Sequence, residues 1–361
     1  MTLSSEALKK SRVLVVEDSE LMRNVLVDII TDSTDFRVVG QAATGYEAIR
    51  LVHELNPDIV TLDLQMPDLG GLGTLGYIMS ETPRPVVVVS SYVSDKAAGP
   101  ALQALEFGAV DVVAKPSGDQ RRDVDTLGDR LLDALRAASE ARVANLRMTD
   151  QSVRTVPTHS QAQPTSARSA FAIAASTGGP RALTEIIPSL PIGLPSAVLI
   201  VQHMPSGFTK PFAERLATLS AVPVHEAVDG QLLEAGSVYL APGGKHMALR
   251  RTAEGIAIAL DDGDALWGVK PAADVLFRSV AAHFGPASGG IVLTGMGRDG
   301  AEGLRAIREV GGWTAVQDPA SSVVYGMPKF AAPHADEQLS LETIAKTIAA
   351  TSLSISRKRR R

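Results

Sequence analysis

Two blocks of this 361-residue sequence alternate short apolar runs, rich in β-branched residues, with segments of helical spacing, and a stretch without periodicity separates the blocks. Such runs, bounded by Asp, Gly, Pro or Ser, are typical of strands buried on both faces of a parallel sheet. The alternation of strand and helix favours sheets covered by helices on both sides. A chain of this length also exceeds one ordinary hydrophobic core. We therefore predict an α/β protein with two domains.

The first block, up to about Gly118, contains five strand-like runs, which predict a five-stranded parallel sheet. Helical spacing is clearest over 21–30 and 45–55, and a last helix is expected over 124–143. The segment 69–77 is rich in glycine where the pattern requires a helix, so that helix is expected to start late or to be weak. The predicted strands are 13–16, 36–39, 59–62, 86–89 and 110–113.

The second α/β block begins at Ala170, after a stretch over 148–169 that is filled with Ser, Thr, Gln and Pro and is predicted to be a linker. Residues 245–260 alternate around Glu254-Gly255 as a β-hairpin does, so we expect a second doubly wound domain with a hairpin. The predicted strands are 171–174, 197–201, 237–240, 290–293 and 314–316, and the predicted helices are 180–187, 209–219, 272–283 and 300–310. The expected boundaries are 11–131 for the first domain, 132–169 for a helix and flexible linker, 170–350 for the second domain and 351–361 for a basic tail.

The composition excludes several classes of protein. There is no cysteine, which excludes disulfides, thiolate metal sites and a cysteine nucleophile, and which suits a reducing compartment. The N-terminus is polar and no apolar stretch is long enough to span a bilayer, so we expect a cytoplasmic protein without a signal peptide. The net charge is −5 although the last five residues carry +5, which leaves −10 on the rest, so no nucleic-acid partner is expected. The basic end, 357–361, is expected to be a frayed terminus.

Polar side chains follow four of the five strands predicted in the first domain. They are Glu17 and Asp18 after the first strand, Asp63 after the third, Ser90 at the fourth and Lys115 at the fifth. In an open parallel sheet, ligands bind outside the carboxyl ends of the strands, where the winding reverses. Three carboxylates in one crevice repel one another, and a hard cation such as Mg²⁺ relieves that repulsion. We interpret Asp63 as a metal ligand and phosphoryl acceptor, with Lys115 and Ser90 contacting the phosphoryl group.

An acid at one strand end is more often a solvated turn residue, but four such positions together are specific. The acid pair, the motif D-x-x-M-P at 63–67, the serine and the K-P dipeptide resemble the response-regulator receiver family over roughly residues 12–131. The resemblance implies a flavodoxin-like sheet and phosphorylation of Asp63 from a histidine kinase. Val112 occupies the family's aromatic switch position, which is a departure from the pattern. The metal ligands implied are Glu17, Asp18, Asp63 and the backbone carbonyl of Gln65.

Ser176, His203 and Asp299 each follow a predicted strand of the second domain. Taken singly, Ser176 is more simply explained as a helix N-cap and His203 as a structural histidine. Together they supply a nucleophile, a base and an orienting carboxylate, and triads are recognised by these roles rather than by chain order. The sequence contains no G-x-S-x-G, which argues against the α/β-hydrolase fold.

Five longer motifs surround these residues. They are A-S-T-G-G-P at 175–180, Q-H-M-P at 202–205, Y-L-A-P-G-G-K-H-M at 239–247, T-G-M-G-R-D-G at 294–300 and S-S-V-V-Y-G-M-P at 321–328. In sequence and order they resemble the chemotaxis receptor methylesterases, over about residues 170–348. Arg298 stands where relatives often carry Asn, and its charge either faces an acidic substrate surface or points to solvent.

This second resemblance implies the roles of the site residues. Ser176 is the nucleophile, His203 the general base and then acid, and Asp299 the orienting carboxylate, while the backbone N–H of Met296 stabilises the oxyanion. The implied reaction removes methyl groups from γ-glutamyl methyl esters of methyl-accepting chemotaxis receptors and also deamidates receptor glutamines. It needs no metal, and Mg²⁺ belongs to the receiver.

The resemblance also implies how the enzyme is controlled. The phosphodonor is a chemotaxis histidine kinase, and the protein is peripheral to receptor arrays rather than inserted in the membrane. The unphosphorylated receiver is expected to cover the Ser176 site until Asp63 is phosphorylated, which shifts a two-state population.

Three alternatives remain open. Residues 295–300 match G-x-G-x-x-G after a strand, with Asp318 after the next strand, which is the spacing of a dinucleotide site. Against this, Asp299 would repel a pyrophosphate, and the motif comes late in its domain and leaves Ser176 and His203 without a role. The second alternative is a non-catalytic adaptor that only binds receptors. The third is an esterase whose substrate is a protein ester outside chemotaxis.

Overall fold

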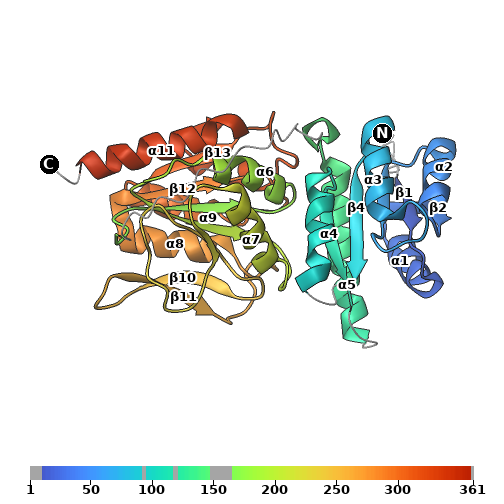
Figure 1. Ribbon diagram of the computed structural model, residues 1–361, viewed down its shortest axis with the longest axis horizontal. Helices are drawn as coiled ribbons and strands as arrows, with labels where there is room; N and C mark the ends of the chain where they lie inside the picture. The colour runs from blue at the N-terminus through green and yellow to red at the C-terminus, as the bar shows by residue number, and fades with distance from the viewer. Residues whose placement is uncertain (1–9, 92–94, 117–120, 147–164, 359–361) are drawn as a thin grey trace, which may run out of the picture. The chain divides into compact units, whose positions relative to one another are not determined.

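The computed structural model describes residues 10–91, 95–116, 121–146 and 165–358, and the chain divides into two compact units, Met1–Thr149 and Asp150–Arg361 (Figure 1). Each unit contains a parallel sheet whose strands are largely buried. Among the residues described, none of the helices combines the length and the apolar character that a bilayer crossing requires.

The first unit alternates strands and helices along the chain. Its elements are β1 (Ser11–Val16), α1 (Glu20–Asp32), β2 (Phe36–Ala42), α2 (Gly45–Leu55), β3 (Ile59–Leu62), α3 (Gly70–Glu81), β4 (Val86–Ser91), α4 (Asp95–Glu106), β5 (Asp111–Lys115) and α5 (Arg121–Glu140). The parallel strands have the order β2-β1-β3-β4-β5, which confirms the predicted five-stranded, flavodoxin-like sheet. The winding reverses between β1 and β3, so the carboxyl ends of these strands border the crevice where ligands bind in such folds.

The glycine-rich helix α3 corrects one prediction. It was expected to start late or to be weak, and the late start is wrong because α3 begins at Gly70, without any side chain that caps it. A Cβ atom added at Gly71 would lie 2.2 Å from the carbonyl oxygen of Asp63 and 2.4 Å from the Cα atom of Leu64. The first turn of α3 therefore packs directly on the loop that carries Asp63. Glycine allows this close approach, and it does not interrupt the helix here.

The second unit also winds in two directions from the middle of a sheet. Its elements are β6 (Ala170–Ala175), α6 (Gly179–Ile186), β7 (Ala197–Gln202), α7 (Thr209–Leu219), β8 (Val224–Glu226), β9 (Val238–Leu240), β10 (His246–Arg251), β11 (Ile256–Asp261), α8 (Ala273–Phe284), β12 (Ser288–Val292), α9 (Ala301–Glu309), β13 (Trp313–Gln317), α10 (Met327–Ala331), β14 (Glu337–Leu339) and α11 (Leu341–Lys358). The sheet order is β14-β13-β12-β6-β7-β9-β8, with every neighbouring pair parallel. This confirms the predicted α/β domain and places its winding reversal between β6 and β12.

The predicted hairpin forms a small sheet of its own. β10 and β11 pair antiparallel, and the N–H of Leu249 donates to the hydroxyl of Ser279 in α8 at 2.7 Å. Figure 1 shows α8 between this hairpin and the main sheet. The hairpin therefore covers the outer side of the helix whose first turn reaches the candidate site.

Two strands and two α-helices of the second unit were not predicted, namely β8, β14, α10 and α11. The helix α11 runs to Lys358, so the expectation of a frayed basic end is wrong for Arg357 and Lys358, while 359–361 lie outside the described residues. Most of the predicted linker, 147–164, also lies outside them. Its last residues pack on the second unit, where the N–H of Ala167 donates to the carbonyl of Leu233 at 3.0 Å.

Candidate functional site

Three side chains with catalytic potential lie beyond the carboxyl ends of β6, β7 and β12, which are neighbours in the sheet. Ser176 follows β6 and His203 follows β7, and the N–H of His203 donates to the carbonyl of Ala175 at 2.9 Å. The N–H of Ser176 donates to the carbonyl of Thr294, in the segment after β12, at 3.1 Å. Asp299 ends that segment, just before α9. Parallel register thus brings the three predicted residues to one edge of the sheet.

His203 and Asp299 are in direct contact. The Nε2 atom of His203 lies 2.8 Å from the Oδ2 atom of Asp299. Because an ionised carboxylate only accepts hydrogen bonds, Nε2 carries the proton and Nδ1 is left as the basic ring nitrogen. Ser176 is half-buried, and its hydroxyl forms no hydrogen bond with any residue that the structure describes. Catalytic hydrogen bonds are often long before substrate binds, so this arrangement is compatible with a serine nucleophile.

The carboxylate of Asp299 is buried and held by backbone donors. Its Oδ2 atom also accepts from the N–H of Ala273 at 2.6 Å, and its Oδ1 atom accepts from Asp274 at 3.0 Å and Gly300 at 2.9 Å. It therefore caps α8, whose N-cap residue has no side-chain hydrogen bond. Burial acts to raise the pKa of Asp299, but His203 and the backbone donors outweigh it, and the pKa lies below its ordinary value. A fixed negative charge thus stands beside the imidazole.

Asp274 is a second buried carboxylate that sequence reasoning missed. Its Oδ1 atom accepts from the N–H of Gly303 in α9 at 2.6 Å, and its Oδ2 atom accepts from the indole N–H of Trp267 at 2.8 Å. Burial raises the pKa of Asp274, and the charge of Asp299 adds to this effect. Asp299 therefore caps α8, while Asp274 in the first turn of α8 caps α9. The sequence signal is only an acid in a first helical turn, which ordinarily indicates a response to the helix dipole.

The segment after β12 runs directly beside Ser176. A Cβ atom added at Gly295 would lie 2.6 Å from the Cβ atom of Ser176, so only glycine fits there. The next N–H, that of Met296, donates to no acceptor among the residues described. An unused donor close to a nucleophile suits the stabilisation of an oxyanion.

The residues predicted to form an acidic pocket in the first unit lie together in the structure. Carboxylate oxygens of Glu17, Asp18 and Asp63 all lie within 4.8 Å of one another. The Nζ atom of Lys115 lies 2.7 Å from Glu17 Oε2 and 2.8 Å from Asp63 Oδ2. Ser90 is buried at the end of β4. The predicted residues thus converge at the ends of β1, β3, β4 and β5.

The charge balance of this pocket favours a cation. Burial raises the pKa of Glu17, and the charge of Asp63 adds to this although Lys115 opposes it. Asp18 is exposed, so the cluster has an open side. The N–H of Gln65 donates to Asp63 Oδ1 at 3.1 Å, which holds the Gln65 backbone at the cluster. A set of carboxylate and carbonyl oxygens fits a hard divalent ion.

Comparisons with known proteins place both units in known families. The CheB methylesterase family model matches residues 171–348, and the response regulator receiver domain model matches residues 13–123. A protein-glutamate methylesterase/protein-glutamine glutaminase of Pyrococcus horikoshii is 40% identical over 343 residues, which cover 94% of this chain and 93% of that protein. This chain belongs to that family.

Two further relatives support the assignment. A family member of Salmonella typhi is 42% identical over 323 residues, with 89% of this chain and 90% of that protein covered. The crystal structure of the Thermotoga maritima CheB methylesterase catalytic domain matches with a TM-score of 0.50 and 37% identity, covering 52% of this chain and 99% of that one. The family, the fold class and the hydrolase class predicted from the sequence are confirmed.

Gln202 and His246, which lie within the motifs at 202–205 and 239–247, hold the backbone around the site through hydrogen bonds. The sequence did not predict this role for either side chain. The amide nitrogen of Gln202 donates to the carbonyls of Ser176 and His203, each at 3.0 Å, and so joins the two turns. The buried ring of His246 accepts from the N–H of Ala272 at 3.1 Å and donates to the carbonyl of Asp264 at 2.9 Å. It thereby fixes the residue that precedes α8, the helix that Asp299 caps.

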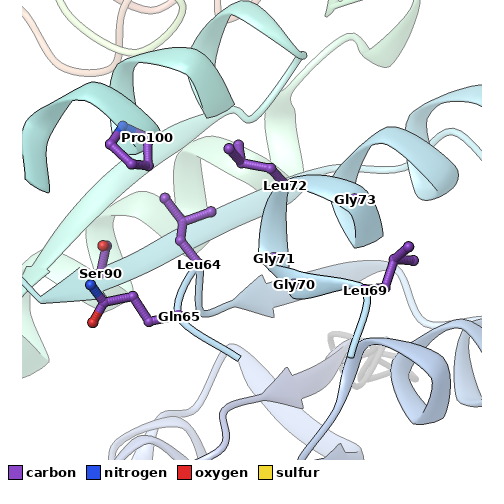
Figure 2. A pocket seen from close by; sticks show the side chains of 9 residues that line it. All are labelled: Leu64, Gln65, Leu69, Gly70, Gly71, Leu72, Gly73, Ser90 and Pro100. Atoms are coloured by element: carbon purple, nitrogen blue, oxygen red, sulfur yellow. The ribbon is translucent and has the colours of Figure 1, made fainter. Parts of the chain in front are cut away.

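A mainly apolar pocket of about 260 Å³ adjoins the acidic cluster in the receiver domain (Figure 2). Gln65 and Ser90 supply its polar side chains, and Leu64, Leu72 and Pro100 are among its apolar ones. The glycines of the first turn of α3 form one wall. The pocket therefore extends from beside the acidic cluster to α3 and α4.

Proposed function

We propose that this chain is a phosphorylation-controlled esterase that hydrolyses γ-glutamyl methyl esters of chemotaxis receptors and deamidates receptor glutamines. One observation carries the proposal: the 2.8 Å contact between His203 and Asp299 at the strand end next to Ser176. The relatives named protein-glutamate methylesterase/protein-glutamine glutaminase supply the substrate class.

The geometry supports a serine mechanism in two stages. In the first, Nδ1 of His203 takes the proton of the Ser176 hydroxyl as its oxygen attacks the ester carbonyl. Asp299 holds the ring and stabilises the imidazolium, and the N–H of Met296 donates to the developing oxyanion. The imidazolium then returns its proton to the methoxide as methanol leaves and an acyl-enzyme forms. In the second stage, His203 takes a proton from water as the water oxygen attacks the acyl carbonyl, the bond to the Ser176 oxygen breaks, and the imidazolium returns its proton to that oxygen, so that free glutamate leaves and Ser176 is restored.

Deamidation of a glutamine follows the same path. The substrate differs only in its leaving group, which departs as ammonia after protonation by His203. Both reactions yield the same glutamyl acyl-enzyme on Ser176, so one site serves both substrates. The esterase step uses no metal in this scheme.

In the receiver domain, we propose that Asp63 accepts a phosphoryl group from a chemotaxis histidine kinase. Lys115 and Ser90 then contact the phosphoryl oxygens. Mg²⁺ would be held by Glu17, Asp18, Asp63 and the carbonyl of Gln65, and when bound it neutralises charge on the transferred group. The reaction belongs to the cytoplasm in this proposal, since a chain without cysteine suits a reducing compartment.

Phosphorylation is proposed to act by a shift between two states. The unphosphorylated receiver covers the Ser176 site, and phosphorylation of Asp63 favours the open state. A fragment from Ala170 onward should then be active without a phosphodonor, whereas the full chain should respond to acetyl phosphate. Equal activity of the fragment and the full chain, with no response to phosphodonor, would remove this regulatory scheme.

Methanol release from methylated receptor membranes tests the enzymatic assignment. Ser176→Ala should lower turnover by about 10⁶-fold because it removes the nucleophile, while the melting temperature stays near that of the wild type. Asp63→Asn should retain basal turnover but lose activation by acetyl phosphate. Methanol release that persists in Ser176→Ala would contradict the serine mechanism, and a wild type that binds receptors without releasing methanol would favour an adaptor.

A further inference from the structure

An exposed pair of side chains, one aromatic and one cationic, lies next to the buried carboxylate of the candidate active site. The Cζ atom of Arg298 is 4.2 Å from the centroid of the Trp267 ring. Trp267 is 43% exposed and Arg298 is also exposed. Arg298 directly precedes Asp299 and lies two residues beyond Met296. A guanidinium stacked on an indole is thus part of the segment that carries the orienting carboxylate and the proposed oxyanion donor.

The backbone holds Trp267 in a conformation that tryptophan rarely adopts. Leu266 and Val269 exchange backbone hydrogen bonds of 3.2 and 3.1 Å, which close a two-residue turn. Its central residues, Trp267 and Gly268, have φ angles of 58° and 77°. Glycine takes such angles readily, but a bulky side chain does not. The indole N–H donates to the buried Asp274 at 2.8 Å, which fixes the ring, and strained positions of this kind concentrate at functional sites.

The charge of Arg298 is not neutralised within the part of the chain that the structure describes, where its guanidinium makes no ion pair or hydrogen bond. Some exposed arginines of this unit are paired, as Arg250 is with Asp229 and Arg305 is with Glu309. Stacking occupies the face of a guanidinium and leaves its in-plane N–H donors for a ligand. Those donors match the two oxygens of a carboxylate.

We propose that Trp267 and Arg298 form a subsite that binds the carboxylate of an unmodified glutamate on the receptor, near the methyl ester that Ser176 attacks. This inference rests on the proposed function. A methyl ester is uncharged, whereas each completed hydrolysis leaves a glutamate carboxylate on the substrate. On a helix, side chains three or four residues apart are about 5–6 Å apart, so a neighbouring glutamate lies close to the ester under attack. The enzyme therefore prefers segments that already carry free glutamates.

The test compares two forms of a methylated cytoplasmic receptor fragment. Both carry one γ-glutamyl methyl ester, and the neighbouring modification sites are glutamate in one form and glutamine in the other. Methanol release is measured with the full-length protein activated by acetyl phosphate, and KM and kcat are determined for each form. The quantity of interest is the ratio of kcat/KM on the glutamate form to that on the glutamine form.

The wild type should favour the glutamate form by about tenfold, the effect of one hydrogen-bonded charged pair. Arg298→Gln should bring the ratio close to one, mainly through a higher KM for the glutamate form. Arg298→Glu should invert the ratio, and Trp267→Phe should lower it in part because the indole bond to Asp274 is lost. Arg251→Gln is the matched control, since it removes an exposed arginine of β10 that has no ion pair among the described residues, and it should keep the wild-type ratio.

The outcomes separate this inference from the function on which it rests. If the wild type releases methanol but Arg298→Gln keeps the wild-type ratio, the subsite is wrong and the esterase assignment stands. The subsite is equally wrong if Arg251→Gln lowers the ratio as much as Arg298→Gln, because the effect would then be one of net charge. A wild type that releases no methanol from either form overturns the proposed function and the subsite together.

Discussion

The acidic pocket of the first unit and the Ser176 site of the second occupy the same place in similar sheets, but they compensate buried charge differently. In the pocket, Glu17 and Asp63 share the ammonium group of Lys115, and burial raises the pKa of Glu17. In the Ser176 site, Asp299 accepts hydrogen bonds from four N–H donors, and its pKa is lowered. Glu17 and Asp299 both follow strands and both are buried. The number of hydrogen-bond donors around each carboxyl group decides whether its pKa is raised or lowered.

This difference fits two kinds of chemistry. The donors around Asp299 belong to the backbone and to His203, so its charge is fixed and can orient an imidazole through a catalytic cycle. Among the residues described, the ammonium group of Lys115 contacts two of the three carboxylates of the pocket, and the remaining negative charge favours the binding of a hard cation. Similar sheet edges therefore hold two different sites. The edge in the second unit holds one carboxylate fixed by backbone donors, and the edge in the first unit holds a cluster of carboxylates that favours a cation.

The largest effect is expected from the substitution Asp299→Asn, which removes the negative charge beside His203. The amide cannot accept from all of the donors that the carboxylate satisfies, and it favours the wrong tautomer of His203. We expect kcat for methanol release to fall by about 10³–10⁴-fold, as in other triads in which the aspartate is replaced. Phosphorylation of Asp63 by acetyl phosphate serves as the control and should be unchanged. A kcat within a factor of ten of the wild type would show that Asp299 is only a helix cap.

A smaller effect is expected from Gly295→Ala. The new methyl group would meet the Sδ atom of Met327 and the Cβ atom of Ser176, so it must displace the methionine side chain together with either the serine or the segment that carries Met296. A shift of this size should lower kcat by about 100-fold. Gly76→Ala in the receiver domain is a matched control, since an added Cβ there meets nothing within 4 Å. Equal activity of the two variants would contradict the proposed packing of nucleophile and oxyanion donor.

The smallest effect concerns thermal stability, where the carboxyl groups of Glu17 and Asp299 should respond to pH in opposite directions. Because the pKa of Glu17 is raised above 4.5, its protonated form stabilises the fold below that pH, and this stabilisation is lost as pH rises through the folded-state pKa. Glu17→Gln stays neutral and should raise the melting temperature of the receiver domain by a few degrees at pH 7 without Mg²⁺. The gain should vanish below pH 4.5.

Asp299→Asn should show the opposite sign in the second domain. The pKa of Asp299 is lowered, so its contribution to stability is present above its unfolded value of 3.8 and is lost as pH falls through the folded-state pKa. The variant should therefore melt below the wild type at pH 7. The melting temperatures of Glu17→Gln and Asp299→Asn, measured between pH 3 and pH 7, test these two directions. Shifts of the same sign in both variants would contradict the difference proposed between the two carboxyl groups.

The sequence predicted much of the fold and the positions of the candidate site residues at the sheet edges. Runs such as 13–16 and 197–201 are short, apolar and rich in β-branched residues, which is typical of strands buried on both faces. Once parallel sheets were inferred, Asp63, Ser176 and His203 had to share sheet edges with their partners, because the carboxyl ends of parallel strands lie together.

Other features had no local signal. β8 and β14 contain three residues each, too few to show a period. The helix α11 is rich in Ser, Thr and Ile, which are weak helix formers, and packing supports it: the buried Ser352 hydrogen-bonds to Ser196, more than 150 residues away. The first turn of α3 was misjudged because its glycines serve a contact with the Asp63 loop rather than a local preference.

By itself, the sequence of this protein determined which side chains follow the strands and therefore lie at the carboxyl edges of the sheets, since strand ends follow from short-range pattern. The tertiary structure alone decided how Asp274 and Asp299 cap each other's helices, how Lys115 is shared and how Arg298 stacks on Trp267. These contacts join residues that lie 25 to 98 positions apart in the sequence. Their energies depend on burial and on donor geometry, which exist only once the chain has folded.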